Sequence, residues 1–184
     1  MGSIAILKLP QKHMILAVDV YYKENSATVG GVTFSECSSK KEDAVYKSRV
    51  ERIEEYVPGE FFRRELPPIL HLLEEHALSP EIILIDGFVY LDGFGRPGLG
   101  KHLFDALGGK TAVIGVAKSR FATTPDETTV YRGQSRSALF VTSAGISLSD
   151  AKAFVESMHG SFRIPYMLKR ADRISKETGT LRTL

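Results

Sequence analysis

The pattern of apolar residues changes once along the chain, close to Pro58-Gly59, and this change constrains the fold more than any other feature. Before it, segments rich in apolar and β-forming residues predict strands at residues 13–22, 27–34 and 44–53, although the third also fits a helix. After it, segments with helical spacing alternate with short apolar runs typical of buried strands. Helices are expected at residues 66–78, 99–107 and 166–177 and from residue 147 onward, and strands at 81–86, 111–117 and 139–142.

An α/β fold with a mixed sheet and helices on both faces fits this order. The first three strands would form an antiparallel meander, and the helix–strand units would add parallel strands. The layout resembles the ribonuclease H-like fold, which is one candidate among several doubly wound folds. The length of 184 residues suits one domain, and no internal repeat or linker is visible, so we expect residues 1–184 to form a single domain.

Composition excludes several classes of protein. Hydrophobic residues make up 43% of the chain, which is too many for a mainly disordered protein. The single cysteine, Cys37, excludes a disulfide scaffold and favours a reducing compartment. No apolar run reaches the roughly 18 residues of a membrane-spanning helix, and the first residues lack the pattern of a signal peptide. We therefore expect a cytoplasmic protein with no membrane partner.

The net charge of +2 is unevenly distributed. Residues 160–184 carry six basic and two acidic side chains, whereas the rest of the chain carries 18 basic and 20 acidic ones. A basic end on a nearly neutral body permits a polyanionic partner, although a solvated helix face would have the same composition. Four basic side chains in this end could follow phosphate groups: Arg163, Lys169, Arg170 and Arg173.

Acidic residues stand at two places that the hydrophobic pattern does not favour. Asp19 interrupts an apolar strand segment, and Asp86 ends another. Functional sites of open α/β sheets form at the carboxyl ends of strands, so the two side chains would share one edge if the strands are neighbours. A third acid, Glu65, opens a helix. Asp86 could instead serve a turn and Glu65 the helix dipole, but Asp19 is costly in a strand unless it is paired or metal-bound.

Convergence of the three carboxylates would require a compensating charge. Two unit charges about 4 Å apart repel each other by roughly 4 kcal/mol at an effective dielectric constant near 20. Such a cluster needs a cation or raised pKa values. Because the ligands are all oxygen and no His or Cys has metal-site spacing, the favoured cation is Mg²⁺ or Mn²⁺. The chemistry indicated is phosphodiester hydrolysis or phosphoryl transfer.

The order of several short segments is similar to that of the endonuclease V family. The segments are Asp19 in its strand, Tyr56-Val57-Pro58-Gly59 ahead of Arg64-Glu65, Asp86-Gly87, Gly115-Val116-Ala117-Lys118, Ile146-Ser147-Leu148, and Arg163-Ile164-Pro165 through Ala171-Asp172. The resemblance covers about residues 14–177. It implies a ribonuclease H-like fold and a Mg²⁺-dependent nuclease, in which Mn²⁺ can substitute. Such an enzyme cuts DNA or RNA one nucleotide beyond the 3′ side of inosine, the nucleoside of the deaminated purine hypoxanthine.

The resemblance also implies roles for individual residues and a monomeric enzyme. Asp19, Glu65 and Asp86 would be catalytic metal ligands, and Lys118 would be a catalytic residue at the scissile phosphate. Substrate-binding positions would be Tyr56, Pro58, Gly59, Gly87, Gly115 and Val116. Among these, the Tyr56 ring would fill the gap left by the extruded base, and the backbone near the last three residues would form the base pocket. The partner would be inosine-containing DNA or RNA.

The chain departs from the family pattern at four places, two of which concern the active site. The family has Gly-His-Arg or Gly-His-Lys before Ile-Ser-Leu, and its His is a fourth active-site residue, whereas residues 142–146 contain no His. Ser143 or Asp150 would be the candidates to take its place. The loop after Asp86 is also altered, and Asp92 in it is either a turn residue or an added ligand. Two alternatives therefore remain, a nucleic-acid-binding protein without turnover and a ribonuclease H-like nuclease with another substrate.

Overall fold

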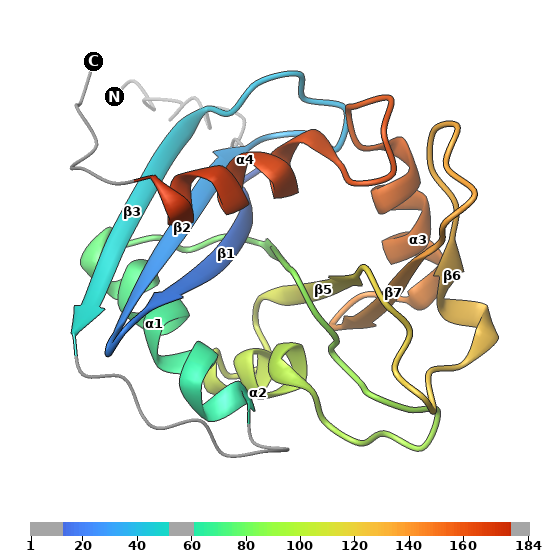
Figure 1. The fold of residues 1–184 in the computed structure, drawn as a ribbon, viewed down its shortest axis with the longest axis horizontal. Helices are drawn as coiled ribbons and strands as arrows, with labels where there is room; N and C mark the ends of the chain where they lie inside the picture. Colours follow the sequence, from blue (N-terminus) through green and yellow to red (C-terminus); the bar gives the residue numbers. More distant parts are fainter. Residues whose placement is uncertain (1–12, 52–60, 178–184) are drawn as a thin grey trace, which may run out of the picture.

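Strands β1 (Ile15–Lys23), β2 (Ser26–Phe34) and β3 (Ala44–Glu51) form the predicted antiparallel meander in the computed structural model, which describes residues 13–51 and 61–177 (Figure 1). A two-residue turn joins β1 to β2, since Lys23 pairs with Ser26. The apolar and β-branched side chains of these segments favour strands over the helical alternative for the third one.

The second half of the chain extends the sheet on the other side of β1. Strands β4 (Ile82–Ile85) and β5 (Ala112–Ala117) run parallel to β1, whereas β7 (Leu139–Ala144) runs antiparallel to β5. The sheet order over the described residues is β3-β2-β1-β4-β5-β7-β6. The edge strand β6 (Thr129–Val130) and the 3₁₀ turn η1 (Asp126–Thr128) were not predicted, because such short elements carry no periodic pattern.

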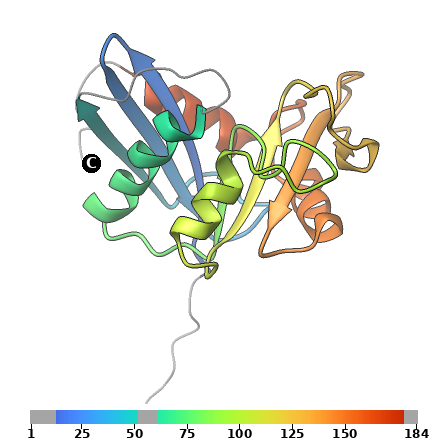
Figure 2. The same ribbon diagram turned by 90° about the horizontal axis from the view of Figure 1, so that it is seen from below.

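Helices cover both faces of this sheet, as the sequence predicts (Figures 1 and 2). The helices α1 (Phe61–Glu75) and α2 (Leu99–Ala106) pack on one face, and α3 (Leu148–Ser157) and α4 (Tyr166–Lys176) pack on the other. The mixed sheet between two helical layers confirms the predicted α/β architecture. Among the described residues, no helix has the length and apolar character needed to cross a membrane.

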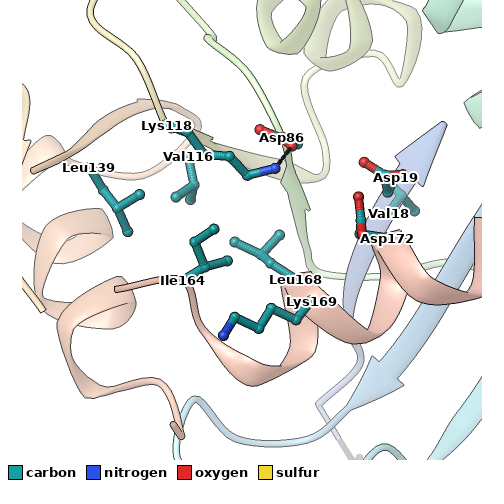
Figure 3. A pocket seen from close by; sticks show the side chains of 10 residues that line it. All are labelled: Val18, Asp19, Asp86, Val116, Lys118, Leu139, Ile164, Leu168, Lys169 and Asp172. Carbon is teal, nitrogen blue, oxygen red and sulfur yellow. Dashed lines mark hydrogen bonds and ion pairs between the residues drawn. The ribbon is translucent and has the colours of Figure 1, made fainter. Parts of the chain in front are cut away.

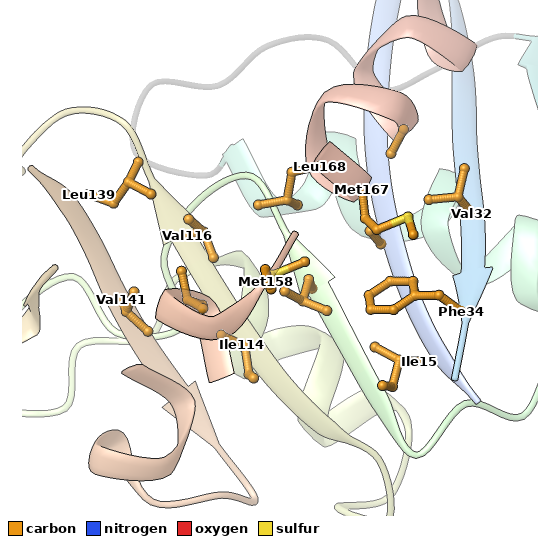
Figure 4. Close-up of a cluster of buried hydrophobic side chains, with 14 of the residues drawn as sticks. Ile15, Val32, Phe34, Ile114, Val116, Leu139, Val141, Met158, Met167 and Leu168 are labelled. Atoms are coloured by element: carbon orange, nitrogen blue, oxygen red, sulfur yellow. The ribbon is translucent and has the colours of Figure 1, made fainter. Parts of the chain in front are cut away.

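Two apolar cores result from the alternation of side chains along the central strands. Leu16 and Val18 face α1 and α2, whereas Ala17 between them faces the α3 and α4 side. The core on the α3/α4 side contains the residues labelled in Figure 4, including Phe34, Met167 and several β5 and β7 side chains. A strand buried on both faces explains the unbroken apolar runs of β1, β4 and β5.

Candidate active site

Asp19 and Asp86 lie side by side at one edge of the sheet. Val18 of β1 is the register partner of Ile85 of β4 in the parallel pairing, so the residue after each of them falls at the same level. Figure 3 shows the two carboxylates at one end of a pocket. Burial raises the pKa of Asp19, and the charges of Asp172 and Asp86 raise it further. The strand pairing therefore brings together the two acids that the hydrophobic pattern singled out.

Glu65 faces this pair from α1. Burial, followed by the charges of Asp19 and Asp86, raises the pKa of the Glu65 carboxyl to about 8. The neighbouring Arg64 opposes this shift only in part, and its guanidinium lies 4.4 Å from the centre of the Tyr22 ring. Three carboxyl groups thus repel one another in a poorly solvated space, where an added cation would relieve the repulsion.

A fourth acid, Asp172, enters the site from α4. It lines the same pocket as Asp19 and Asp86 (Figure 3). It also forms an ion pair of 2.5 Å with Lys176. Asp172 was not among the predicted site residues, although the segment that contains it was part of the family resemblance. The signal in the sequence was an acid adjoining the buried side of an amphipathic helix, next to Ala171.

Close packing between α4 and β2 sets the position of this helix. A Cβ atom on Gly30 would lie 2.5 Å from both the carbonyl oxygen of Ala171 and the amide nitrogen of Ser175. Glycine therefore lets the helix backbone approach the strand that pairs with β1 at Asp19. The Ser175 hydroxyl is buried there and lies 2.6 Å from Oδ2 of Asp19, to which it donates a hydrogen bond.

Lys118 lies beside the acidic cluster at the end of β5. Its ammonium forms an ion pair with Oδ2 of Asp86, drawn as a dashed line in Figure 3. The Arg163 guanidinium donates to the backbone carbonyl of Lys118 and, at 2.8 Å, to that of Ala138. Arg163 thus holds the backbone that carries the Lys118 side chain. The predicted proximity of Lys118 to the carboxylates is present in the structure.

Two of the four basic residues that were expected to follow phosphates instead hold the fold together. Arg163 is bonded to backbone carbonyls, and Arg170 forms a 2.8 Å ion pair with Glu42. Lys169 and Arg173 are exposed on α4. Phosphate contacts are therefore open to these two side chains, whereas Arg163 and Arg170 already have partners.

The predicted base-pocket residues do not all face the same way. A Cβ atom on Gly115 would lie 2.5 Å from the carbonyl oxygen of Gly87, so Gly115 packs against the loop after β4. Gly87 has a φ of +148°, and the space where its Cβ would lie is open. Val116 points to the α3/α4 core instead, because successive side chains of a strand face opposite sides. The Val116 side chain therefore lies on the other face of the sheet from Gly115, and the base pocket that the backbone near Gly87, Gly115 and Val116 would form stays a prediction.

Three predicted substrate-binding residues, Tyr56, Pro58 and Gly59, lie outside the described residues. Their roles remain predictions.

The segment that lacks the expected histidine lies far from the carboxylates. Ala144 pairs with Val113 near the start of β5, whereas Asp86 and Lys118 are at the opposite end of the parallel strands. The Ser143 hydroxyl donates to the carbonyl of Ile146 at 3.0 Å, and Asp150 lies in the first turn of α3, whose N-cap is Ser147. Ser143 and Asp150 are thus not site residues. Antiparallel pairing of β7 with β5 is the reason, because it carries this segment to the far end.

Asp92 is a turn residue. Its Oδ1 accepts hydrogen bonds from the backbone amides of Phe94 at 2.9 Å and Arg96 at 3.0 Å. These bonds and the exposure of the loop show the turn role that was one of the two alternatives for this residue.

Comparison with known proteins identifies the family. The family model for endonuclease V matches residues 4–173. The chain belongs to the endonuclease V family. The endonuclease V of Pyrococcus horikoshii is 31% identical over 179 residues, which cover 95% of this chain and 78% of the relative. The endonuclease V of Streptomyces coelicolor is 30% identical over 145 residues, which cover 66% of this chain and 59% of that relative.

Solved endonuclease V structures share the fold. The enzyme of Streptomyces avermitilis superposes with a TM-score of 0.76 at 25% identity, covering 90% of this chain and 80% of that one. A variant of the Ciona intestinalis enzyme, in complex with a 23mer DNA containing an inosine followed by a ribo-adenosine, gives 0.70 at 22% identity, with 91% and 86% covered. The expected ribonuclease H-like fold is thereby confirmed, and family membership places the chain among nucleases.

The carboxylates of this endonuclease V fold have the donor chemistry of a hard-cation site. Asp19, Glu65, Asp86 and Asp172 offer only oxygen atoms, which suit Mg²⁺ or Mn²⁺. The mutual charge effects on Asp19 and Glu65 fit a bound cation as well. Within residues 13–51 and 61–177, no three His, Cys, Asp or Glu side chains already lie close enough together to hold one ion. The negative charge of the Asp86 carboxylate is balanced by the Lys118 ammonium, with which it forms an ion pair.

Proposed function

We propose that this chain is a divalent-metal-dependent endonuclease that hydrolyses a phosphodiester bond on the 3′ side of inosine in DNA or RNA. The observation that carries this proposal is the pair Asp19 and Asp86, each directly after the last paired residue of the β1–β4 ladder, with the pKa of Glu65 raised to about 8 beside them. Membership of a nuclease family supports the reaction class. The inosine-containing DNA bound to the Ciona relative supports the substrate.

The acidic residues would supply the metal ligands. Asp19, Asp86 and Asp172 come from three different elements and meet at one pocket, and Glu65 adds a carboxyl from α1. When bound, Mg²⁺ or Mn²⁺ would lower the pKa of a coordinated water and stabilise charge on the phosphate oxygens. The protein's part is to fix the ligands before the substrate arrives. Asp19 inside β1 and Asp86 directly after β4 are held by the sheet and serve this purpose better than residues of a free loop would.

Lys118 would act on the substrate phosphate. Its ammonium forms an ion pair with Asp86 at the acidic cluster. When substrate and metal bind, Asp86 would contact the metal and the Lys118 ammonium would contact the phosphate instead. A lysine is a compact positive charge on a flexible stem, which suits contact with a phosphate whose charge changes during hydrolysis. The open space at Gly87, next to Asp86, is where a flat base could approach the backbone.

A cleavage assay tests the proposal. Single-stranded DNA and RNA with one inosine and a labelled end would be incubated with the protein in Mg²⁺ and, separately, in Mn²⁺. We expect a cut one nucleotide 3′ of the inosine, absent from a matched strand with adenosine or guanosine in that position. Asp86→Asn removes one ligand charge while preserving shape, and it should lose at least about 10²-fold in rate. Equal cleavage by Asp86→Asn in the same metal would refute the ligand assignment.

The original reason to consider a binding protein without turnover no longer applies. It rested on the missing histidine in residues 142–146, and that segment lies at the other end of β5 from Lys118. A nuclease with another substrate stays testable in the same assay, by comparing inosine with uracil, abasic and unmodified strands.

A further inference from the structure

A pocket connects the acidic cluster to the α3/α4 face of the sheet. The space inside it that a water-sized sphere can reach is about 60 Å³, and its total empty space is about 430 Å³ when the open mouth is counted. Asp19, Asp86 and Asp172 form one end, and the walls beyond them are apolar and include Val116, Leu139 and Leu168 (Figure 3). A pocket with acids at one end and an apolar body is suited to a ligand with a phosphate–metal end and a flat apolar part.

The far end of this pocket carries a cation beside an exposed ring. Lys169 lines the pocket and extends away from the carboxylates (Figure 3). Its ammonium lies 4.4 Å from the ring centre of Phe162, and 67% of the Phe162 surface is exposed. Within the part of the chain that the structure describes, Lys169 has no carboxylate partner. A positive charge next to an open aromatic face is the combination by which proteins bind unpaired nucleic acid strands.

The pocket lies on the opposite face of the sheet from the expected base-binding side. Gly115 packs against Gly87 on the α1/α2 side, whereas Val116 belongs to the α3/α4 side and lines the pocket. The acidic cluster occupies the edge between the two faces. A strand with its modified base near Gly87 and its scissile phosphate at the acids would therefore continue over the α3/α4 side.

We propose that this pocket is a subsite for the nucleotide that follows the scissile phosphate, held with its base unpaired. The base would lie against the apolar walls and the Phe162 ring, and the next phosphate would lie near Lys169. The inference rests on the proposed nuclease function. It adds that the enzyme binds an unpaired nucleotide on the 3′ side of the cut as well as the modified base on the 5′ side.

Removal of one base at a time from the substrate tests the subsite. Inosine-containing DNA strands with a single abasic position, placed on either side of the cut, would be compared for wild type and Phe162→Ala. Cleavage would be followed as kcat/KM, and binding as fluorescence anisotropy with Asp86→Asn and Asp86→Asn/Phe162→Ala. Tyr131→Ala serves as control, because Tyr131 is 63% exposed, similar to Phe162, whereas it is Phe162 whose ring lies against Lys169 of the pocket.

We expect loss of the base just 3′ of the cut to weaken wild-type binding and kcat/KM about tenfold, within the range of a base stacked on an aromatic ring. Phe162→Ala should show that loss with the intact strand and no further loss with the abasic one. Lys169→Met should reduce the salt dependence of binding by about one phosphate contact. Tyr131→Ala should respond to the abasic position as wild type does.

Two outcomes overturn the subsite. One is a wild-type protein indifferent to that base, and the other is a Phe162→Ala protein as sensitive to its removal as wild type. Failure of the wild type to cut any inosine strand would instead refute the proposed function. The anisotropy comparison still decides the subsite in that case, because it needs no turnover.

Discussion

Substitution of Gly30 by alanine should push α4 away from the active site. The new Cβ would lie 2.5 Å from the carbonyl oxygen of Ala171 and from the amide nitrogen of Ser175, and 2.9 Å from Cβ of Ile174. The first two atoms belong to the helix backbone and the third is bonded directly to it, so none of them can rotate away. Since ordinary contacts with carbon lie near 3.5 Å, the helix would have to move outward by about 1 Å.

This displacement has two measurable consequences. The hydrogen bond from Ser175 to Asp19, 2.6 Å long, would stretch to about 3.5 Å and be lost. Overpacking costs about 1–3 kcal/mol, whereas replacement of a glycine by alanine gains about 0.4–1 kcal/mol through the unfolded chain. The packing cost exceeds this gain, so Gly30→Ala should lower the free energy of unfolding by about 1–2 kcal/mol. A 1 Å misplacement of Asp172 should reduce kcat/KM by about 10²-fold.

Gly31→Ala is the matched control, because the neighbouring residue faces the other side of the sheet. Its Cβ would meet the methyl ends of Leu72 at 2.9 Å and Leu16 at 3.3 Å, which can rotate. Urea unfolding followed by circular dichroism gives the stability of both variants, and the inosine cleavage assay gives the activity. If Gly30→Ala is as stable and as active as Gly31→Ala, the close contact between β2 and α4 does not position the site.

Three further perturbations test individual contacts. Ser175→Ala removes the hydroxyl that donates a hydrogen bond to the Asp19 carboxylate, and it should raise the Mg²⁺ concentration for half-maximal activity about tenfold. The control Ser157→Ala loses only a hydrogen bond to a carbonyl of its own helix and should leave that concentration unchanged. Arg132→Met removes a buried guanidinium that donates hydrogen bonds to four backbone carbonyls. The free energy of unfolding should fall by about 3 kcal/mol, measured as a lower urea midpoint. An unchanged midpoint would contradict this role. Burial raises the pKa of Glu42, but the hydrogen bonds from Arg170, the backbone and Tyr166 and the charge of Arg170 together outweigh it, so the pKa is lowered overall. Glu42→Gln should therefore lower the free energy of unfolding by about 1 kcal/mol at pH 7. This difference from wild type should be present above the unfolded-state pKa of about 4.5 and disappear as the pH falls through the lower folded-state pKa. A difference in the free energy of unfolding that persists at pH 3 would contradict this assignment.

The sequence by itself determined the longer helices and strands and the positions of the first two acids. The first part of β1 and all of β4 are apolar enough to be buried on both faces, and an acid directly after such an apolar run marks the point where full burial ends. Asp19 and Asp86 could therefore be predicted from local pattern. The start of α3 is a local feature too, since the Ser147 hydroxyl accepts a hydrogen bond from the amide of Asp150. Each of these features depends on residues within one element.

Only the tertiary structure decided which other residues complete the site. Asp172 and Ser175 reach Asp19 because Gly30, far away in the chain, lets α4 pack closely on β2. The segment with the missing histidine looked relevant in the sequence, but the antiparallel direction of β7 carries Gly145 to the other end of the sheet. Strand direction and the distance between helix and sheet depend on contacts between distant segments. Local propensity records none of these contacts, because each residue pattern is compatible with either direction and with several helix positions.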